Sequence, residues 1–132
     1  PHSQLVANFI GETDFLGGRV VSVAGDRVEV QTRIGHFKGV LGDPARPPAF
    51  GADVTVSIRP ECWILSTERI GENSLPGRIG ESVYLGEVAQ HAFICGDTTL
   101  KVFELNPRFA AQAGRGQVFA AVRPEDVVVL VE

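Results

Sequence analysis

Hydrophobic and polar residues alternate with a period of two along most of this chain, which predicts short β-strands. The clearest stretch is 53–59, where Val54, Val56 and Ile58 share one face. Gly-Asp and Gly-Glu pairs separate several of these stretches and supply tight turns. The pattern predicts strands at 20–24, 27–32, 35–41, 53–59, 62–65, 78–85, 88–95, 100–105, 117–123 and 127–131.

Two segments depart from this alternation. Residues 4–10 place apolar side chains at helical spacing, and Gly11 follows as a helix-ending residue. Asn106-Pro107 can start a single helical turn over 107–113. We therefore expect short helices in these two places and β-structure elsewhere.

One sequence unit is used twice. Val-Ser-Ile-Arg-Pro-Glu at 56–61 returns as Ala-Val-Arg-Pro-Glu at 121–125, and a short apolar run follows each copy. Gly18-Arg19-Val20 opens the first unit and Gly77-Arg78-Ile79 opens the second. Each unit holds about five predicted strands, which is typical of an OB-like barrel. The sequence predicts an all-β fold of two OB-like barrel repeats packed together, residues 1–65 and 66–132, which together form one domain.

Composition narrows the function classes. The 132 residues carry a formal net charge of −4, with one Trp and one Tyr. Single-strand nucleic-acid binding needs a basic groove with stacking aromatic side chains, so we expect no nucleic-acid partner. The two cysteines, Cys62 and Cys95, form no Cys-x-x-Cys pair, and we expect no metal site.

Catalytic motifs are absent from the sequence. It contains no phosphate-binding Gly-x-x-x-x-Gly-Lys-Ser/Thr loop, no Gly-x-Ser-x-Gly and no His-Glu-x-x-His. His2, His36 and His91 are scattered, which favours surface or strand positions over a catalytic cluster. We expect no catalytic residue and no bound cofactor in these 132 residues. The chain begins with Pro and has no Met, which suggests a piece of a longer protein.

The two Arg-Pro-Glu tripeptides are the most specific local feature, and they admit two interpretations. In the structural one, Arg ends a strand, Pro interrupts the hydrogen-bond ladder, and Glu accepts a hydrogen bond nearby. In the functional one, an exposed guanidinium pairs with a carboxylate of a partner chain. We favour the structural interpretation because both copies carry the motif. The candidate residues, for a structural or an interface role, are Arg59, Pro60, Glu61, Arg123, Pro124 and Glu125.

The combined pattern resembles a known family. It consists of Val6-Ala7-Asn8-Phe9-Ile10-Gly11, Phe15-Leu16, Val56–Glu61, Tyr84-Leu85-Gly86 and Val122–Asp126. It resembles the C-terminal regulatory domain, the transport-associated OB (TOBE) domain, of ABC importer ATP-binding subunits of the maltose, spermidine/putrescine and ferric-iron type. The chain departs from the family at Asp14, where Asn is frequent, and at Cys62, where the second copy has Asp126.

The resemblance implies a setting for the domain. It implies an ABC ATPase domain in the same chain, upstream of these residues, which would bind ATP and Mg²⁺. It also implies membrane permease subunits as partners, a homodimer through the regulatory domain, and a peripheral place on the cytoplasmic face of the inner membrane. The linker helix would then lead in from the ATPase domain. Substrate class varies within the family.

A second function class stays open at this point. A stand-alone OB module that binds a small ligand or an oxyanion, like the molybdate-binding relatives of this family, would show the same strand pattern. The sequence that precedes Pro1 distinguishes the two, because an upstream ABC cassette decides for the importer subunit.

Overall fold

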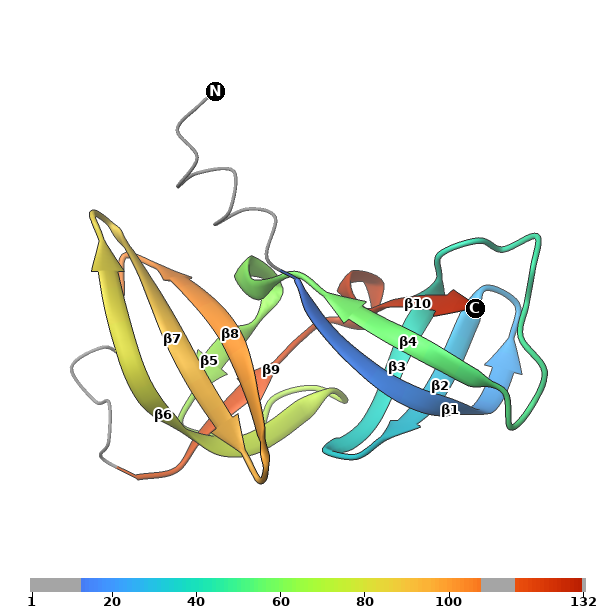
Figure 1. Ribbon diagram of the computed structural model, residues 1–132, viewed down its shortest axis with the longest axis horizontal. Coiled ribbons are helices and arrows are strands. Elements are labelled where there is room, and N and C mark those ends of the chain that lie inside the picture. Colours follow the sequence, from blue (N-terminus) through green and yellow to red (C-terminus); the bar gives the residue numbers. More distant parts are fainter. Residues whose placement is uncertain (1–12, 108–115, 132) are drawn as a thin grey trace.

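The computed structural model describes residues 13–107 and 116–131, and they form the all-β fold that the sequence predicts. Both expected helices, at 4–10 and 107–113, lie outside the described residues except for Pro107, which is irregular. Within the described ranges the only helical elements are two 3₁₀ turns, η1 (Pro60–Cys62) and η3 (Pro124–Asp126). The strands are β1 Asp14–Ala24, β2 Arg27–Thr32, β3 Gly35–Leu41, β4 Asp53–Ile58, β5 Ile64–Ser66, β6 Ser74–Leu85, β7 Val88–Cys95, β8 Thr98–Leu105, β9 Val118–Ala121 and β10 Val128–Val131 (Figure 1).

The strands form two units that lie side by side (Figure 1). The first is a closed barrel with the strand order β1-β2-β3-β10-β4. The second is a five-stranded sheet with the order β5-β9-β6-β7-β8. The prediction of two OB-like units is confirmed, although hydrogen bonds close only the first of them among the described strands.

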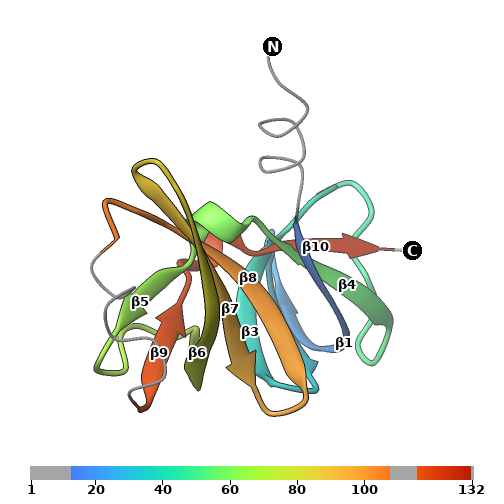
Figure 2. The ribbon, with the colours of Figure 1, turned by 60° about the vertical axis from the view of Figure 1, so that its left-hand side comes forward.

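The two units exchange their last strands. β5 leaves the first repeat and pairs with β9 of the second, where Ile64 lies opposite Ala121. In return, β10 leaves the second repeat and enters the barrel between β3 and β4, where Val129 lies opposite Val56 (Figure 2). Strand pairing therefore crosses the sequence boundary between residues 65 and 66, and each sheet contains strands from both repeats.

Most predicted strands occur within a few residues of their predicted limits. The turns between them are set by glycines such as Gly25, Gly86 and Gly96, whose φ angles lie between 60° and 68°. The strand predicted at 62–65 begins too early, because Pro60 starts the turn η1 and Cys62 belongs to that turn. β5 begins only at Ile64.

A matched pair of glycines supports the internal repeat. A Cβ atom on Gly18 of β1 would lie 2.8 Å from the carbonyl oxygen of Gln31, and one on Gly77 of β6 would lie 2.5 Å from that of Ile94. A few residues later each strand has a bulge, between Val20 and Ser22 in β1 and between Ile79 and Ser82 in β6. Glycine and bulge together bend the first strand of each unit around its core.

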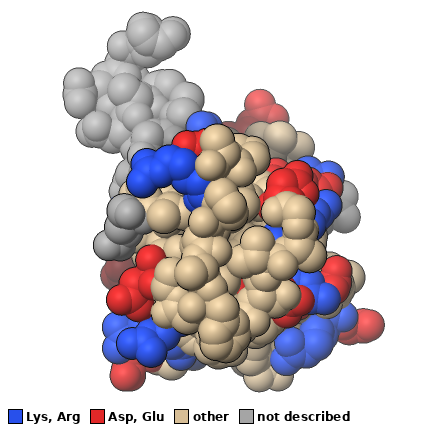
Figure 3. Space-filling view, turned by 90° about the vertical axis from the view of Figure 1, so that its right-hand side faces the viewer, with Lys and Arg blue, Asp and Glu red and all other residues tan. Residues whose placement is uncertain are grey.

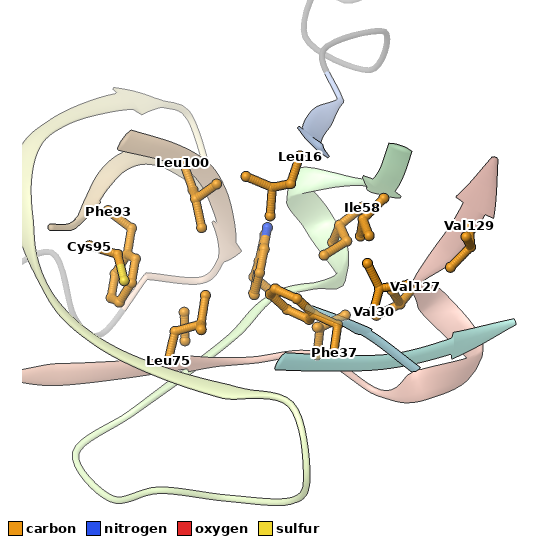
Figure 4. Packing of buried hydrophobic residues seen from close by; sticks show 14 of the residues in the cluster. Leu16, Val30, Phe37, Ile58, Leu75, Phe93, Cys95, Leu100, Val127 and Val129 are labelled. Carbon is orange, nitrogen blue, oxygen red and sulfur yellow. The ribbon is translucent and has the colours of Figure 1, made fainter. Parts of the chain in front are cut away.

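The buried side chains of the two units form one continuous cluster. Figure 4 shows Leu75, Phe93 and Leu100 of the second unit on one side and Phe37 and Ile58 of the barrel on the other. Trp63, only 4 % exposed, belongs to the same cluster, and its ring meets that of Phe37 edge to face with centroids 6.4 Å apart. Trp63 lies between η1 and β5, so the crossing segment itself contributes to the core.

Candidate functional site: the crossover junction

Both Arg-Pro-Glu motifs lie where the chain crosses from one unit to the other. Arg59 follows β4 and Arg123 follows β9, and in each case Pro is the first residue of the 3₁₀ turn. Proline suits that position because its φ is fixed near the helical value and the position needs no N–H donor. The turns close in the same way, since Cys62 N donates to Arg59 O and Asp126 N donates to Arg123 O, both at 2.9 Å.

The charged side chains of the motifs point to solvent. Both arginine side chains are 66 % exposed, and Glu125 is also exposed. Arg123 pairs with Asp126 at 3.2 Å, and Arg59 approaches Glu61 at 3.9 Å. Neither guanidinium is buried, so burial of these groups gives the structural interpretation no support. Within each motif, the proline and the backbone turn shape the crossover.

Charges of both crossovers act on Cys62. Burial is the main cause that raises the pKa of its thiol, Asp126 and Glu61 raise this pKa further, and Arg59 and Arg123 lower it. A raised pKa keeps the thiol protonated, and the protonated form is a poor nucleophile. Burial likewise raises the pKa of Cys95. The junction therefore offers no reactive thiolate.

A buried carboxylate ties the junction to both units. Asp14, 8 % exposed, accepts a hydrogen bond from Trp63 Nε1 on Oδ2 and one from the backbone N–H of Lys101 in β8 on Oδ1, each at 2.9 Å. Burial raises the pKa of this carboxyl to about 6, although both hydrogen bonds act in the opposite direction. Sequence reasoning noted Asp14 only as a departure from the family pattern. The sequence contained only a weak signal for this buried pair. It consists of an acidic residue directly before Phe15-Leu16 and a single tryptophan elsewhere in the chain.

Asn73 makes a second tie between the units. Its side-chain amide donates to Lys38 O and its side-chain oxygen accepts from Lys38 N, both at 2.8 Å, as a neighbouring strand would. Its own carbonyl accepts from the N–H of Val122, just after β9. Asn73 is 1 % exposed, so each of these groups depends on its protein partner. Sequence reasoning did not find this residue, because an isolated Asn in a polar connection has no distinctive pattern.

The second unit contains a Ser-His-Glu arrangement whose central imidazole is shielded from solvent. His91 Nδ1 lies 2.7 Å from Ser82 Oγ, and its Nε2 lies 2.8 Å from Glu104 Oε1. The imidazole is fully buried, at 0 % exposure. His91 is therefore on a strand, as expected, but it belongs to a buried polar network that satisfies its own hydrogen bonds.

The described surface has shallow hollows, and on the barrel side of the molecule charged side chains lie around a broad uncharged area (Figure 3). One of about 240 Å³ lies beside Arg123 and has apolar walls that include Ile64, Ile70 and Val122. Another of about 400 Å³ lies on the barrel beside Arg19, Arg33 and Asp53. In the two described ranges, no group of three His, Cys, Asp or Glu side chains is placed to hold a metal ion. None of the helical elements described there is long and apolar enough to cross a membrane.

A tandem of OB-type units joined by exchanged strands defines the class of this protein, and a solved structure shows the same architecture. The chain superimposes on a crystal structure of the cytoplasmic molybdate-binding protein ModG with a TM-score of 0.77, over 90 % of this chain and 96 % of that one. The sequence identity is 16 %, so this likeness concerns the fold.

Sequence comparison identifies the family. Residues 56–130, more than half of the chain, match the TOBE domain. The chain is 30 % identical over 97 % of its length to the spermidine/putrescine import ATP-binding protein PotA of Rubrobacter xylanophilus, and 32 % identical over 90 % to that of Pseudomonas fluorescens. It belongs to the TOBE domain family. It spans about a third of those relatives, 31 % and 33 % of their lengths.

Proposed function

We propose that the chain is the regulatory domain of an ABC importer ATP-binding subunit, and that it pairs with a second copy of itself. The observation that carries this proposal is the length of the alignment. Nearly the whole chain aligns with two import ATP-binding proteins, but it covers only about a third of the length of each. The remaining two thirds of such a protein would hold the ATPase domain, which would bind ATP and Mg²⁺. Membrane permease subunits on the cytoplasmic face of the inner membrane would be the further partners.

The geometry of the junction suits a domain whose two units move together as one body when they transmit a signal. Exchanged strands, a shared core and the Asp14 and Asn73 ties join the two units, so a displacement at one is passed to the other. β1 begins at Asp14, which places the buried carboxylate next to the entry of the chain. A movement delivered from an upstream ATPase domain would reach β1, Trp63 and β8 together.

The test compares the full-length protein with a variant truncated before residue 13, each reconstituted with its permease. We expect the truncated protein to hydrolyse ATP but to lose the change in hydrolysis rate that its regulatory inputs produce. The 132-residue chain alone should give no heat of specific binding with Mg-ATP in calorimetry. A gene without an upstream ABC cassette, or full regulation in the truncated protein, would overturn the proposal.

The likeness to ModG, whose structure is described as having molybdate bound, favours one second candidate, an oxyanion-binding module. The hollow beside Arg19 and Arg33 has guanidinium donors that an oxyanion can use, whereas the one hydroxyl that lines it, Thr32 Oγ1, already donates to Gly35 O. Asp53 lies in the same hollow and pairs with Arg19 at 3.3 Å, so a carboxylate would repel the anion. Calorimetric titration with molybdate tests this candidate, and a micromolar site would favour it over the importer subunit.

A further inference from the structure

The two polar ties between the units are copies of one another. Asp14 and Asn73 occupy the same place in the sequence repeat, each four positions before one of the matched glycines. Each reaches into the opposite unit, because Asn73 binds the backbone of Lys38 in β3 and Asp14 binds that of Lys101 in β8. The junction therefore contains one clasp twice, Asn73 with Lys38 and Asp14 with Lys101.

The two clasps differ in what they can donate. Asn73 binds Lys38 twice, since its Oδ1 accepts from Lys38 N and its Nδ2 donates to Lys38 O, both at 2.8 Å. Asp14 Oδ1 accepts from Lys101 N at 2.9 Å in the same way. An ionised carboxylate has no hydrogen to donate, so Asp14 cannot make the second bond. Its Oδ2 instead accepts from Trp63 Nε1 at 2.9 Å.

The tryptophan belongs to the Asp14 clasp alone. Trp63 and Val127 are equivalent in the repeat, since each directly follows a 3₁₀ turn, and they are 4 % and 0 % exposed. Of the two, only the indole has a side-chain N–H. The acceptor-only carboxylate of Asp14 is therefore matched to Trp63.

Proton uptake would give Asp14 the hydrogen that it lacks. A protonated carboxyl group has one donor and one acceptor, as the amide of Asn73 has. The N–H and C=O of a strand residue point to the same side, so Lys101 O lies on the side of Lys101 N and of Asp14. A carbonyl oxygen accepts two hydrogen bonds, so Lys101 O can take this hydrogen whatever else it binds.

We propose that Asp14 is a proton-operated switch between the two units: when it is ionised it holds the indole of Trp63, and when it is protonated its Oδ2–H donates to Lys101 O, as Asn73 Nδ2 does to Lys38 O. The bond from Trp63 then weakens, because a neutral oxygen is a poorer acceptor than a carboxylate. Trp63 lies between η1 and β5, so acid loosens the hold on this crossover. The proposal goes beyond the proposed function and does not depend on it.

The surroundings of Asp14 support two accessible protonation states. Burial favours the neutral form and raises the pKa of this carboxyl to about 6, although its two hydrogen bonds act in the opposite direction. The described elements packed against it carry other charged or titratable side chains, namely Arg59 after β4, Glu61 and Cys62 in η1, and Lys101 and Glu104 in β8. Arg59 and Glu61 have side chains that are 66 % and 47 % exposed, and Glu104 binds His91 at 2.8 Å. A variant at position 14 separates the Asp14 proton from all of theirs.

Nuclear magnetic resonance of the indole Nε1–H tests the switch, because the chain has one tryptophan and gives one such signal. We expect the proton signal of Trp63 to move upfield as the pH falls through about 6, since its acceptor loses its charge. Asp14→Asn should keep the signal near its acidic position at every pH, because the amide imitates the protonated carboxyl. Asp53→Asn is the matched control. It removes a carboxylate that is 75 % exposed and should leave the wild-type titration unchanged.

A reciprocal variant installs the switch in the other clasp. Asn73→Asp should destabilise the chain at neutral pH, because its carboxylate oxygen faces Lys38 O. The loss relative to wild type should shrink as the pH falls, since protonation restores the missing donor. Urea unfolding of both proteins at neutral and mildly acidic pH measures this difference.

Three outcomes would overturn the proposal. The first is an indole signal that does not titrate in the wild-type chain, or that titrates equally in Asp14→Asn. The second is an Asp14→Asn chain that fails to fold, because the amide represents the protonated form. The third is a loss of stability in Asn73→Asp that is the same at neutral and acidic pH.

Discussion

Asp14 and Trp63, 49 positions apart in the chain, are joined by a buried hydrogen bond of 2.9 Å from the indole Nε1–H to the carboxylate. The second carboxylate oxygen accepts the N–H of Lys101, so both oxygens face donors. This geometry matches the ionised carboxylate, while burial opposes the charge. The first strand, the crossover and the edge of the second sheet therefore meet at one ionisable group.

Stability should depend on pH through Asp14. Its folded-state pKa of about 6 lies above its ordinary value of 3.8, so the unfolded chain releases this proton first as the pH rises. The contribution of Asp14 to the free energy of unfolding is therefore greatest below pH 3.8 and is lost as the pH rises to about 6. The loss should be roughly 3 kcal/mol. Urea unfolding followed by the fluorescence of Trp63, the single tryptophan, measures it at each pH.

The comparison is with Asp14→Asn, which cannot titrate. The difference in unfolding free energy between wild type and this variant should change across that pH window, whatever its sign at neutral pH. Asp53→Asn serves as the control for the loss of one exposed carboxylate, because the Asp53 side chain is 75 % exposed. Curves for Asp14→Asn that run parallel to wild type would contradict the assignment of the shift to this buried carboxyl.

The arginines of the twin motifs should contribute little to stability. Arg59→Ala and Arg123→Ala each remove an exposed ion pair, and such pairs are worth about 0–1 kcal/mol. Both variants should therefore unfold thermally close to wild type. Pro60→Ala should cost more, because Pro60 is buried and its ring restricts the unfolded chain. A large loss of stability in either arginine variant, with little effect of Pro60→Ala, would give the structural role to the guanidinium.

Much of this fold could be predicted from the sequence because its signals are local. The alternation in 53–59 and the glycine turns at 25, 86 and 96 depend on neighbouring residues, so they placed the strands closely. The exchange of β5 and β10 could not be predicted, since an apolar run such as Val127–Val131 could pair with strands of either unit. Asp14 and Asn73 were missed for the same reason, because their partners lie 35 or more positions away.

The matched glycines should not tolerate a side chain. Gly18→Ala and Gly77→Ala each place a methyl group under 3 Å from a backbone carbonyl oxygen of the paired strand, and a shift of backbone must follow. Overpacking of this kind costs about 1–3 kcal/mol. Gly17→Ala is the control next in sequence, since no atom lies within 4 Å of its added Cβ. Equal melting temperatures for all three variants would argue against the close strand approach.

The side chain of Asn73 should contribute more to the free energy of unfolding than its polar surroundings indicate. Asn73→Ala leaves the N–H and the carbonyl of Lys38 without their partner in a buried region, which costs about 1–3 kcal/mol for each unsatisfied group. Asn73→Asp keeps the acceptor for Lys38 N but sets a carboxylate oxygen against Lys38 O, so it should also destabilise. Chemical unfolding of both variants measures this, and wild-type stability in Asn73→Asp would contradict the two-bond bridge.

The exchanged strands should make the two halves of the chain mutually dependent. A break in the connection 67–72 leaves one fragment with β1–β5 and another with β6–β10, and neither holds all the strands of a sheet. The first fragment lacks β10, which closes the barrel between β3 and β4, and the second lacks β5. Each fragment alone should be largely unfolded, and an equimolar mixture should recover the β-sheet circular dichroism and buried-tryptophan fluorescence of the intact chain.

Val129→Asp in the second fragment, which puts a charge at a position 1 % exposed within the barrel, should prevent this recovery. Leu130→Asp, on the outer face of the same strand, should permit it. Cooperative folding of either fragment alone would show that the exchange is not needed to complete the sheets.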